Sequence, residues 1–170
     1  MLVGFGCTPE TVTPTPPPTS PASATPTETA REREERLAYE AAEKSYREFR
    51  AEFYRVLRSG GSKTATPDMK KFAGGPYLAE ATEIVQAYKG EKGRSVGQER
   101  VASVHGGGYS PTELVLEACD DTTKVKTVDR RGQVVSRGEY RYSKLTVRLV
   151  DGNWLIWTGS GKGVDTCDGN

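Results

Sequence analysis

The sequence predicts an α+β domain in which three N-terminal helices pack on a curved antiparallel sheet of four to five strands. Residues 30–89 show the three- and four-residue spacing of apolar side chains that is typical of helices. Residues 113–157 instead contain short β-rich runs that alternate with turn residues. Asp151-Gly152 stands between two of these runs, and this dipeptide is a strong signal for a β-hairpin. Helices followed by hairpin-linked strands favour an antiparallel sheet that carries the helices on one face.

The first predicted helix covers residues 30–58 and is the longest. Gly60-Gly61 follows it, and glycine readily adopts the left-handed conformation that ends helices. Residues 67–73 and 76–89 are predicted as two further helices, because each begins with a proline and is followed by glycine. The first helix carries one apolar stripe, whose members are Ala42, Tyr46, Phe49, Phe53 and Val56/Leu57.

The strands are predicted from β-rich runs and the turn residues that separate them. Gly106–Gly108 is expected to break the first strand and form a loop, and Asp120-Asp121 to end the second strand in a turn. A second turn is expected at residues 129–132. The predicted strands cover residues 96–105, 113–119, 123–128, 140–150 and 154–157.

A change of phase within residues 140–150 predicts a bulge. Leu145, Val147 and Leu149 alternate in phase with one another, whereas Tyr140 and Tyr142 are out of phase with them. Because an inserted residue shifts a period-two pattern by one, we expect a β-bulge near residues 143–144 that curves the sheet around the helices.

Residues 1–7 are interpreted as the remnant of a lipoprotein signal. Cys7 follows a small residue at the end of an apolar stretch, as at a lipoprotein cleavage site where the thiol is acylated. On this interpretation the true start lies upstream, and the alternative is an ordinary free thiol. Residues 8–29 are a Thr/Pro-rich tether that lacks apolar periodicity and is expected to be disordered. In an extended polyproline conformation it would reach roughly 60 Å.

Composition limits the classes of partner. The net charge is +1, with no clustered basic face that would favour nucleic acid. No run approaches the roughly 20 apolar residues that span a bilayer. The single histidine and the absence of a Cys-x-x-Cys spacing lead us to expect neither a metal nor a cofactor. The expected partners are the membrane, through an acyl chain on Cys7, and a cell-envelope protein.

Cys119 and Cys167 are predicted to form a disulfide if the protein is exported. Cys119 ends one predicted strand and Cys167 follows the last one, so a bridge would hold the C-terminal tail on the sheet. The glycine-rich residues 158–166 should fray without that bridge. The alternative is two buried free thiols in a cytoplasmic protein.

Three segments resemble chemical motifs but lack their remaining parts. His105–Gly108 matches the oxyanion-hole segment of lipases, yet there is no Gly-x-Ser-x-Gly elbow and no second histidine. Residues 158–163 depart from the phosphate-loop pattern, because a glycine follows the lysine. Asp120-Asp121 has no third ligand placed by the sequence, so a turn is favoured over a metal site or a carboxylate pair. No catalytic residue is assigned.

Aromatic residues could either line a cavity between the sheet and the helices or fill the core there. The candidates for the cavity lining are Tyr46, Phe49, Phe53, Tyr140, Tyr142, Trp154 and Trp157.

The arrangement resembles the nuclear transport factor two-like superfamily, also called ketosteroid isomerase-like or SnoaL-like. The resemblance rests on the Tyr-x-x-Phe spacing of the first helix, the two further helices and the Asp151–Trp154 step, Asp-Gly-Asn-Trp. More narrowly, Ala118–Asp121 and the turn at 128–132 resemble lipoproteins of actinobacteria and their phages, in which such a domain follows a Thr/Pro-rich tether. The resemblance implies a cone-shaped, cystatin-like α+β barrel over residues 30–168. Isomerases and dehydratases of the superfamily need a carboxylate or histidine as an acid/base group deep in the cavity. The resemblance implies that this chain would need such a group to be an enzyme of that kind.

The leading hypothesis is therefore a non-enzymatic lipoprotein on the outer face of the cell membrane, acting as a binding or assembly module. One alternative is a small isomerase- or dehydratase-like enzyme that uses the cone cavity. Another alternative, from the family resemblance, is a phage-encoded modifier of the host surface that excludes a second infection.

Overall fold

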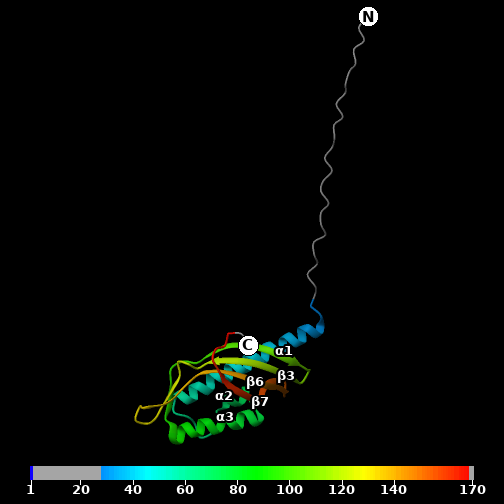
Figure 1. Ribbon diagram of the computed structural model, residues 1–170. Helices are drawn as coiled ribbons and strands as arrows, with labels where there is room; N and C mark the ends of the chain where they lie inside the picture. The colour runs from blue at the N-terminus through cyan, green and yellow to red at the C-terminus, as the bar shows by residue number, and fades with distance from the viewer. Residues whose placement is uncertain (2–27, 169–170) are drawn as a thin grey trace.

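The computed structural model describes Met1 and residues 28–168, so Cys7 and most of the predicted tether lie outside the described residues. Three helices come first in this part of the chain, followed by strands (Figure 1). They are α1 (Ala30–Arg58), α2 (Pro67–Phe72) and α3 (Gly75–Ala87), and a short π-helical segment, η1 (Tyr88–Lys92), follows α3. The α+β class and the three N-terminal helices are thus confirmed.

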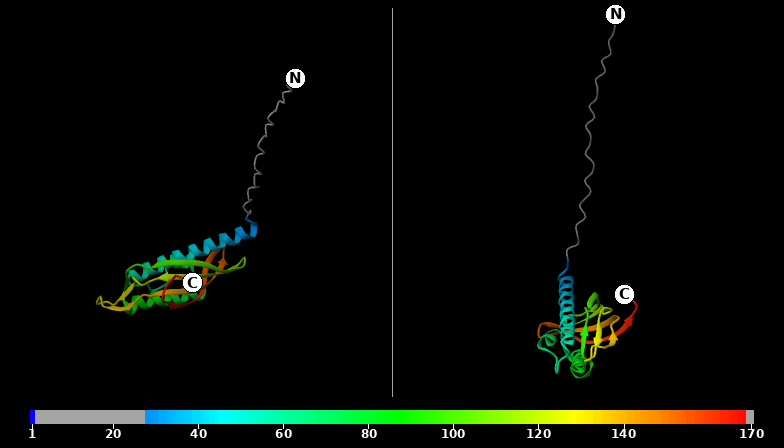
Figure 2. Two further views of the ribbon diagram at one scale, coloured as in Figure 1. Left: turned by 45° about the horizontal axis from the view of Figure 1, so that its top comes forward. Right: turned by 90° about the vertical axis from the view of Figure 1, so that its left-hand side faces the viewer.

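The long helix α1 is defined by a cap at its start and an apolar face along its length. The Glu32 backbone N–H donates to the Thr29 hydroxyl at 3.2 Å, and the Thr29 N–H donates back to the Glu32 carboxylate at 2.8 Å. This reciprocal pair satisfies donors that have no partner inside the helix. The first turns are exposed and protrude beyond the sheet (Figure 2). The buried face consists of Ala38, Ala42, Tyr46, Phe49, Glu52, Phe53, Val56 and Leu57.

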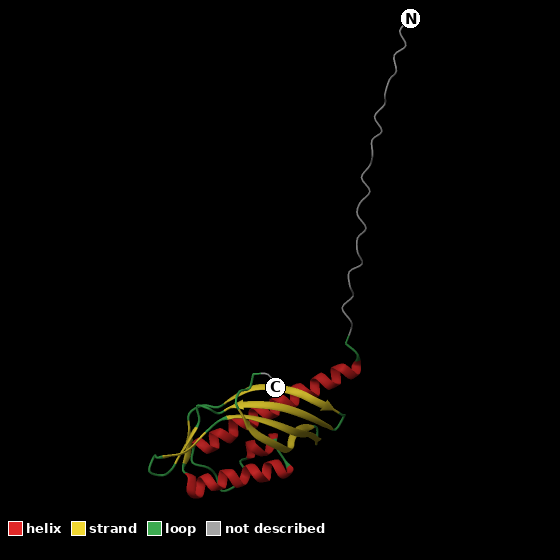
Figure 3. Ribbon diagram, viewed as in Figure 1, coloured by secondary structure: helices red, strands yellow, loops and turns green. Residues whose placement is uncertain are grey.

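The strands form two antiparallel sheets (Figure 3). The larger sheet has the order β2-β3-β6-β7, with β2 (Arg100–Tyr109), β3 (Glu113–Asp121), β6 (Tyr140–Val150) and β7 (Asn153–Val164). The smaller sheet has the order β1-β4-β5, with β1 (Arg94–Val96), β4 (Lys126–Val128) and β5 (Val134–Arg137). The large sheet has the predicted number of strands, whereas the second, three-stranded sheet of the described residues was not predicted. The predicted first strand, 96–105, contains parts of β1 and β2, which belong to different sheets.

The hairpin predicted at Asp151-Gly152 is confirmed. Val150 of β6 pairs with Asn153 of β7, so the loop has two residues. Both loop residues have positive φ, 49° and 77°, as a type I′ turn requires. This loop sets the pairing register of β6 and β7. In that register Leu145 and Val147 of β6 face the helices. The core between helices and sheet includes Leu114, Leu116 and Ile156 beside the α1 stripe.

The predicted bulge near residues 143–144 was wrong. β6 pairs with β3 without a register shift from Tyr140 to Arg148. The shift lies instead on β7, where Trp157 is the extra residue between the pairs Thr146–Thr158 and Val147–Ile156. β2 has two further shifts, between Val101 and Ser103 and between Gly106 and Gly108. The bulges therefore lie on the two outer strands, which can bend without disturbing the pairing of the central two.

The glycines of β2 do not form the predicted loop, because they continue the strand. Gly106 pairs with Leu116, and Gly108 pairs with Val115. A Cβ on Gly106 would lie 2.6 Å from the Tyr39 ring, so only glycine lets this ring of α1 lie on the strand. The Gly108 N–H also donates to the Tyr39 hydroxyl at 3.0 Å. Glycine here serves close packing rather than strand termination.

Candidate functional site

A cavity of about 570 Å³ lies between α1, α3 and the inner face of the large sheet, with β4 and β5 contributing to its wall. Its volume is within the range of small-molecule sites, about 300–1,000 Å³. Aromatic rings supply much of the wall, and polar residues from β5, β6 and β7 together with several aliphatic side chains contribute to the rest. The aromatic lining residues are Tyr46, Phe49, Phe53, Tyr54, Tyr77 and Tyr88.

Of the seven aromatic residues proposed for the lining, the three on α1 do line the cavity: Tyr46, Phe49 and Phe53. The four on the strands do not. Tyr140 and Tyr142 lie on the opposite face of β6 from Leu145 and Val147, because side chains alternate along a strand that has no bulge at this point.

The two tryptophans do not line the cavity, and Trp154 follows the alternative that these aromatic residues fill the core. Trp154 packs against the edge of the core. Trp157, the bulged residue of β7, lies against Gly74-Gly75 and has the Arg148 guanidinium 5.5 Å from its ring centroid. The bulge turns Trp157 away from the cavity, toward the start of α3.

The Asp120 carboxylate lies behind the cavity wall, where it forms a buried ion pair with Arg50 and accepts a hydrogen bond from a tyrosine. The Tyr46 hydroxyl donates to Oδ2 of Asp120 at 2.7 Å. Nη2 of Arg50 lies 3.0 Å from the same oxygen. The side chain of Asp120 is 2% exposed and that of Arg50 is 12% exposed. Tyr46 and Arg50 are four residues apart on α1, so one helix face presents both to the carboxylate.

The prediction that Asp120 lies in a turn was wrong. β3 continues through Asp121, and Asp120 is in phase with Leu114, Leu116 and Ala118, which all face the core. Asp121 points the other way and accepts hydrogen bonds from the backbone N–H and hydroxyl of Thr123. The two adjacent carboxylates are therefore on opposite faces of the sheet and do not form a pair.

Arg50 lines the cavity and is held by aromatic rings. Its guanidinium carbon lies 4.9 Å from the Tyr54 ring centroid and 5.9 Å from the Phe53 centroid, within cation–π range. Nη2 is also 3.5 Å from the Tyr54 hydroxyl. Nε of Arg50 and Oδ1 of Asp120 are buried and have no hydrogen-bond partner within the described residues. The protein thus uses only part of the hydrogen-bonding capacity of this guanidinium.

The electrostatic setting keeps these groups as hydrogen-bond donors. Burial raises the pKa of the Tyr46 hydroxyl far above its usual range, and the negative charge of Asp120 adds to the rise. Burial also raises the pKa values of Tyr54 and Tyr77. For Arg50, burial acts to lower the pKa, but the Asp120 carboxylate and the neighbouring tyrosines together outweigh it and the pKa is raised. At neutral pH the cavity therefore presents protonated tyrosines and a charged guanidinium.

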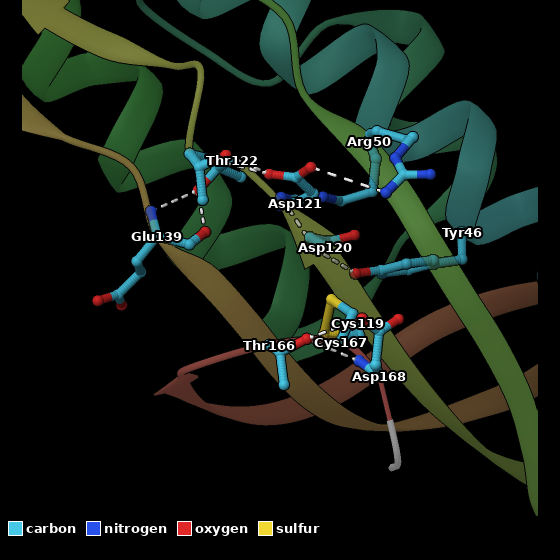
Figure 4. The surroundings of a disulfide bond; sticks show 12 residues. Tyr46, Arg50, Cys119, Asp120, Asp121, Thr122, Glu139, Thr166, Cys167 and Asp168 are labelled. Atoms are coloured by element: carbon cyan, nitrogen blue, oxygen red, sulfur yellow. Dashed lines mark hydrogen bonds and ion pairs between the residues drawn. A yellow bond between two sulfur atoms is a disulfide. The ribbon is translucent and has the colours of Figure 1, made fainter.

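The structure contains the predicted disulfide between Cys119 and Cys167, with their Cα atoms 5.7 Å apart. Cys119 precedes Asp120 on β3, so the disulfide lies on the outer face while Asp120 points inward toward Tyr46 (Figure 4). With the disulfide present, the tail at 158–166 lies along the sheet as expected and is mostly strand, since β7 pairs with β6 as far as Val164–Tyr140. Gly159, Ser160 and Gly161 of this segment line the cavity.

The site residues that the sequence did not reveal are Arg50, Tyr54, Tyr77 and Asp120. For Asp120 there was a usable signal, because it continues the alternation of Leu114, Leu116 and Ala118. For Arg50 the signal was its position four residues after Tyr46 on the apolar stripe. Within residues 28–168 no group of three or more His, Cys, Asp or Glu is arranged to hold a metal ion. Nor is any helix in this part of the chain both long and apolar enough to cross a membrane.

No protein-family model matches the sequence, and no curated protein matches it. Among solved structures, a "putative aromatic ring hydroxylase" from Novosphingobium aromaticivorans is similar with a TM-score of 0.52 and 12% identity, over 76% of this chain and 91% of that chain. The intermembrane space region of the chloroplast protein ARC6 is similar with a TM-score of 0.49 and 15% identity, over 74% and 97% of the two chains. A "putative dehydratase from the NTF2-like family" of Streptomyces avermitilis has a TM-score of 0.47 and 12% identity, over 78% and 99%. The likeness to the hydroxylase shows a shared α+β fold.

Proposed function

We propose that this chain is a binding module and that its cavity takes a small, mostly apolar molecule. The observation that carries the proposal is the open cavity of about 570 Å³ beside a packed core. Six aromatic residues line it, and aromatic walls with a few convergent polar groups are typical of small-molecule sites. Phe49 and Phe53, two of these residues, stack on each other with their ring centroids 5.9 Å apart.

The location that we propose is the outer face of a cell membrane. Cys7 would carry the acyl chain, and the Thr/Pro-rich tether would hold a domain of the nuclear transport factor two-like kind away from the bilayer. The Cys119–Cys167 disulfide supports this location, because disulfides persist in oxidising compartments. A cell-envelope protein is a second proposed partner.

The membrane anchor is tested by feeding labelled palmitate to cells that express the full-length gene. The protein should become labelled, and Cys7→Ser should remove the label because it removes the thiol that would be acylated. An unlabelled protein, or a label that persists in Cys7→Ser, would contradict the anchor. The cavity proposal does not depend on this result.

Binding in the cavity is tested by filling it from β6. Ser143 lines the cavity, whereas Lys144 is exposed on the opposite face of the same strand. We expect Ser143→Phe to abolish the binding of N-phenyl-1-naphthylamine, a neutral fluorescent probe, and Lys144→Phe to leave it unchanged. Equal binding by both variants would show that the probe binds elsewhere.

A second candidate function is an isomerase- or dehydratase-like enzyme. The observation that favours it is the buried Asp120 carboxylate with the Tyr46 hydroxyl 2.7 Å away, behind the wall of an open cavity. Such an enzyme would exchange protons next to a carbonyl group of its substrate. Deuterium exchange into 2-tetralone, followed by NMR, tests this class. Exchange no faster than in buffer would count against it, as would equal rates for the wild type and Asp120→Asn.

A further inference from the structure

We infer that the ligand of this cavity carries a carboxylate and that the guanidinium of Arg50 binds it. The inference rests on the proposed ligand-binding function and adds the chemical class of the ligand. Arg50 is the one charged residue of the cavity wall that is largely buried, with 12% of its side chain exposed. The four other charged residues of the wall are exposed, and they are Glu80, Arg137, Glu139 and Arg141.

The guanidinium has donors to spare. Within residues 28–168, all hydrogen bonds and ion pairs of Arg50 use Nη2, which contacts Asp120 and Tyr54. Nε is buried without a partner. A guanidinium has five N–H donors in a planar fork, and this fork matches a carboxylate in two-point hydrogen bonds. Nη1 makes no hydrogen bond or ion pair within the described residues, so its N–H groups can bind a second carboxylate, from a ligand in the cavity.

The position of Arg50 is fixed before any ligand binds. Asp120 holds one nitrogen at 3.0 Å, and the Tyr54 ring lies 4.9 Å from the guanidinium carbon. Because the side chain is already ordered, little conformational entropy is lost when it binds a ligand. Tyr54 and Tyr77 line the same cavity, and their hydroxyls stay protonated, so they add no negative charge.

The charge of the site selects among ligand classes. An amine would meet the buried positive charge of Arg50, whereas a carboxylate would be attracted by it. Asp120 offsets part of that attraction, since its carboxylate lies against the same guanidinium. Because Asp120 weakens this attraction, removing its charge should strengthen the binding of a carboxylate. The binding of a neutral analogue should stay nearly unchanged, and this difference can be measured.

The test compares 2-naphthoate with 2-naphthamide, which have the same rings and nearly the same shape but differ in charge. We expect the wild type to bind the acid at least about ten-fold more tightly than the amide, because hydrogen bonds to charged groups contribute more than neutral ones. In Asp120→Asn the ratio should rise further. Titration calorimetry below the unfolding temperature of each variant measures both constants.

A double variant separates recognition from folding. Arg50→Met with Asp120→Leu removes both charges together, so no unpaired charge is left buried. We expect it to lose the preference for the acid, so that the acid and the amide bind with similar dissociation constants. Arg141→Met, at an exposed arginine of the cavity wall, should keep the preference.

The outcomes distinguish the two proposals. If the wild type binds the acid and the amide equally, the carboxylate inference fails while the binding cavity stands. If Arg141→Met rather than the double variant loses the preference, recognition occurs at the exposed wall and the inference about Arg50 is wrong. If neither compound binds, at millimolar concentration, both the cavity proposal and the inference are overturned.

Discussion

Asp120→Ala is expected to lower the free energy of unfolding by about 3–5 kcal/mol, because it leaves the charge of Arg50 buried without a partner. The substitution also removes the acceptor of the Tyr46 hydroxyl, which is 2.7 Å away in the native protein. Tyr46 is 1% exposed, so water cannot replace that acceptor without rearrangement of the core. Urea denaturation of the wild type and the variant measures the difference.

The double variant Arg50→Met with Asp120→Leu provides the control for this prediction. It should recover the part of the loss that comes from the unpaired charge of Arg50, since replacing both partners of a buried pair by apolar side chains is often neutral or stabilising. The part that comes from the Tyr46 hydroxyl should remain, because this hydroxyl still lacks its acceptor. Asp121→Ala is the matched control on the same strand, because Asp121 lies on the other face, where it accepts hydrogen bonds from Thr123 and pairs with the exposed Arg100 at 3.7 Å. A loss in Asp120→Ala no greater than that in Asp121→Ala would contradict the role given to the buried pair.

Cys167→Ser is expected to lower the free energy of unfolding by about 2–4 kcal/mol. The disulfide joins residues 48 positions apart in sequence, and a loop of that length gives about 4 kcal/mol in the chain-entropy account, which native-state effects commonly reduce. The variant should be made in a Cys7→Ser background, so that the released Cys119 thiol finds no other cysteine. Denaturation under non-reducing conditions gives the stability, with Cys7→Ser alone as the reference.

The local effect of Cys167→Ser should be confined to the end of the chain. β7 pairs with β6 as far as Val164, so hydrogen exchange should rise at residues 165–168 and not in the helices. The segment expected to fray without the disulfide is therefore shorter than residues 158–166, the segment that the sequence alone predicts to fray. Two free thiols at 119 and 167, found by mass spectrometry of protein exported under oxidising conditions, would contradict the bridge and weaken the proposed location.

The sequence alone was enough to predict elements that follow from local propensity, such as the periodicity of a helix or the residues of a turn. The helix at 30–58 has an unbroken apolar stripe, and Asp151-Gly152 has the residues that a two-residue hairpin loop needs. Prediction failed where tertiary contacts decide. Gly106 looks like a strand breaker until the Tyr39 ring is seen lying against it, and β1 and β5 are too short to show a period.

The candidate site was harder to predict than the fold for a related reason. Asp120 is a charged residue that occupies a core position, and a sequence pattern assigns such residues to turns unless the partner charge is known. That partner, Arg50, lies 70 residues earlier in the chain, and a single sequence does not show the contact between them. The disulfide was predictable because exported proteins have few other uses for two well-separated cysteines.

The protruding start of α1 separates the N-terminal end of the domain from the cavity. Tyr46, the first residue of the cavity wall, comes 16 residues after Ala30, which corresponds to about 24 Å of helix at 1.5 Å per residue. A bead, a surface or a fused protein attached before residue 28 would therefore pull at a point well away from the cavity. Because of this distance, the protein is best immobilised through its N-terminal side in binding measurements.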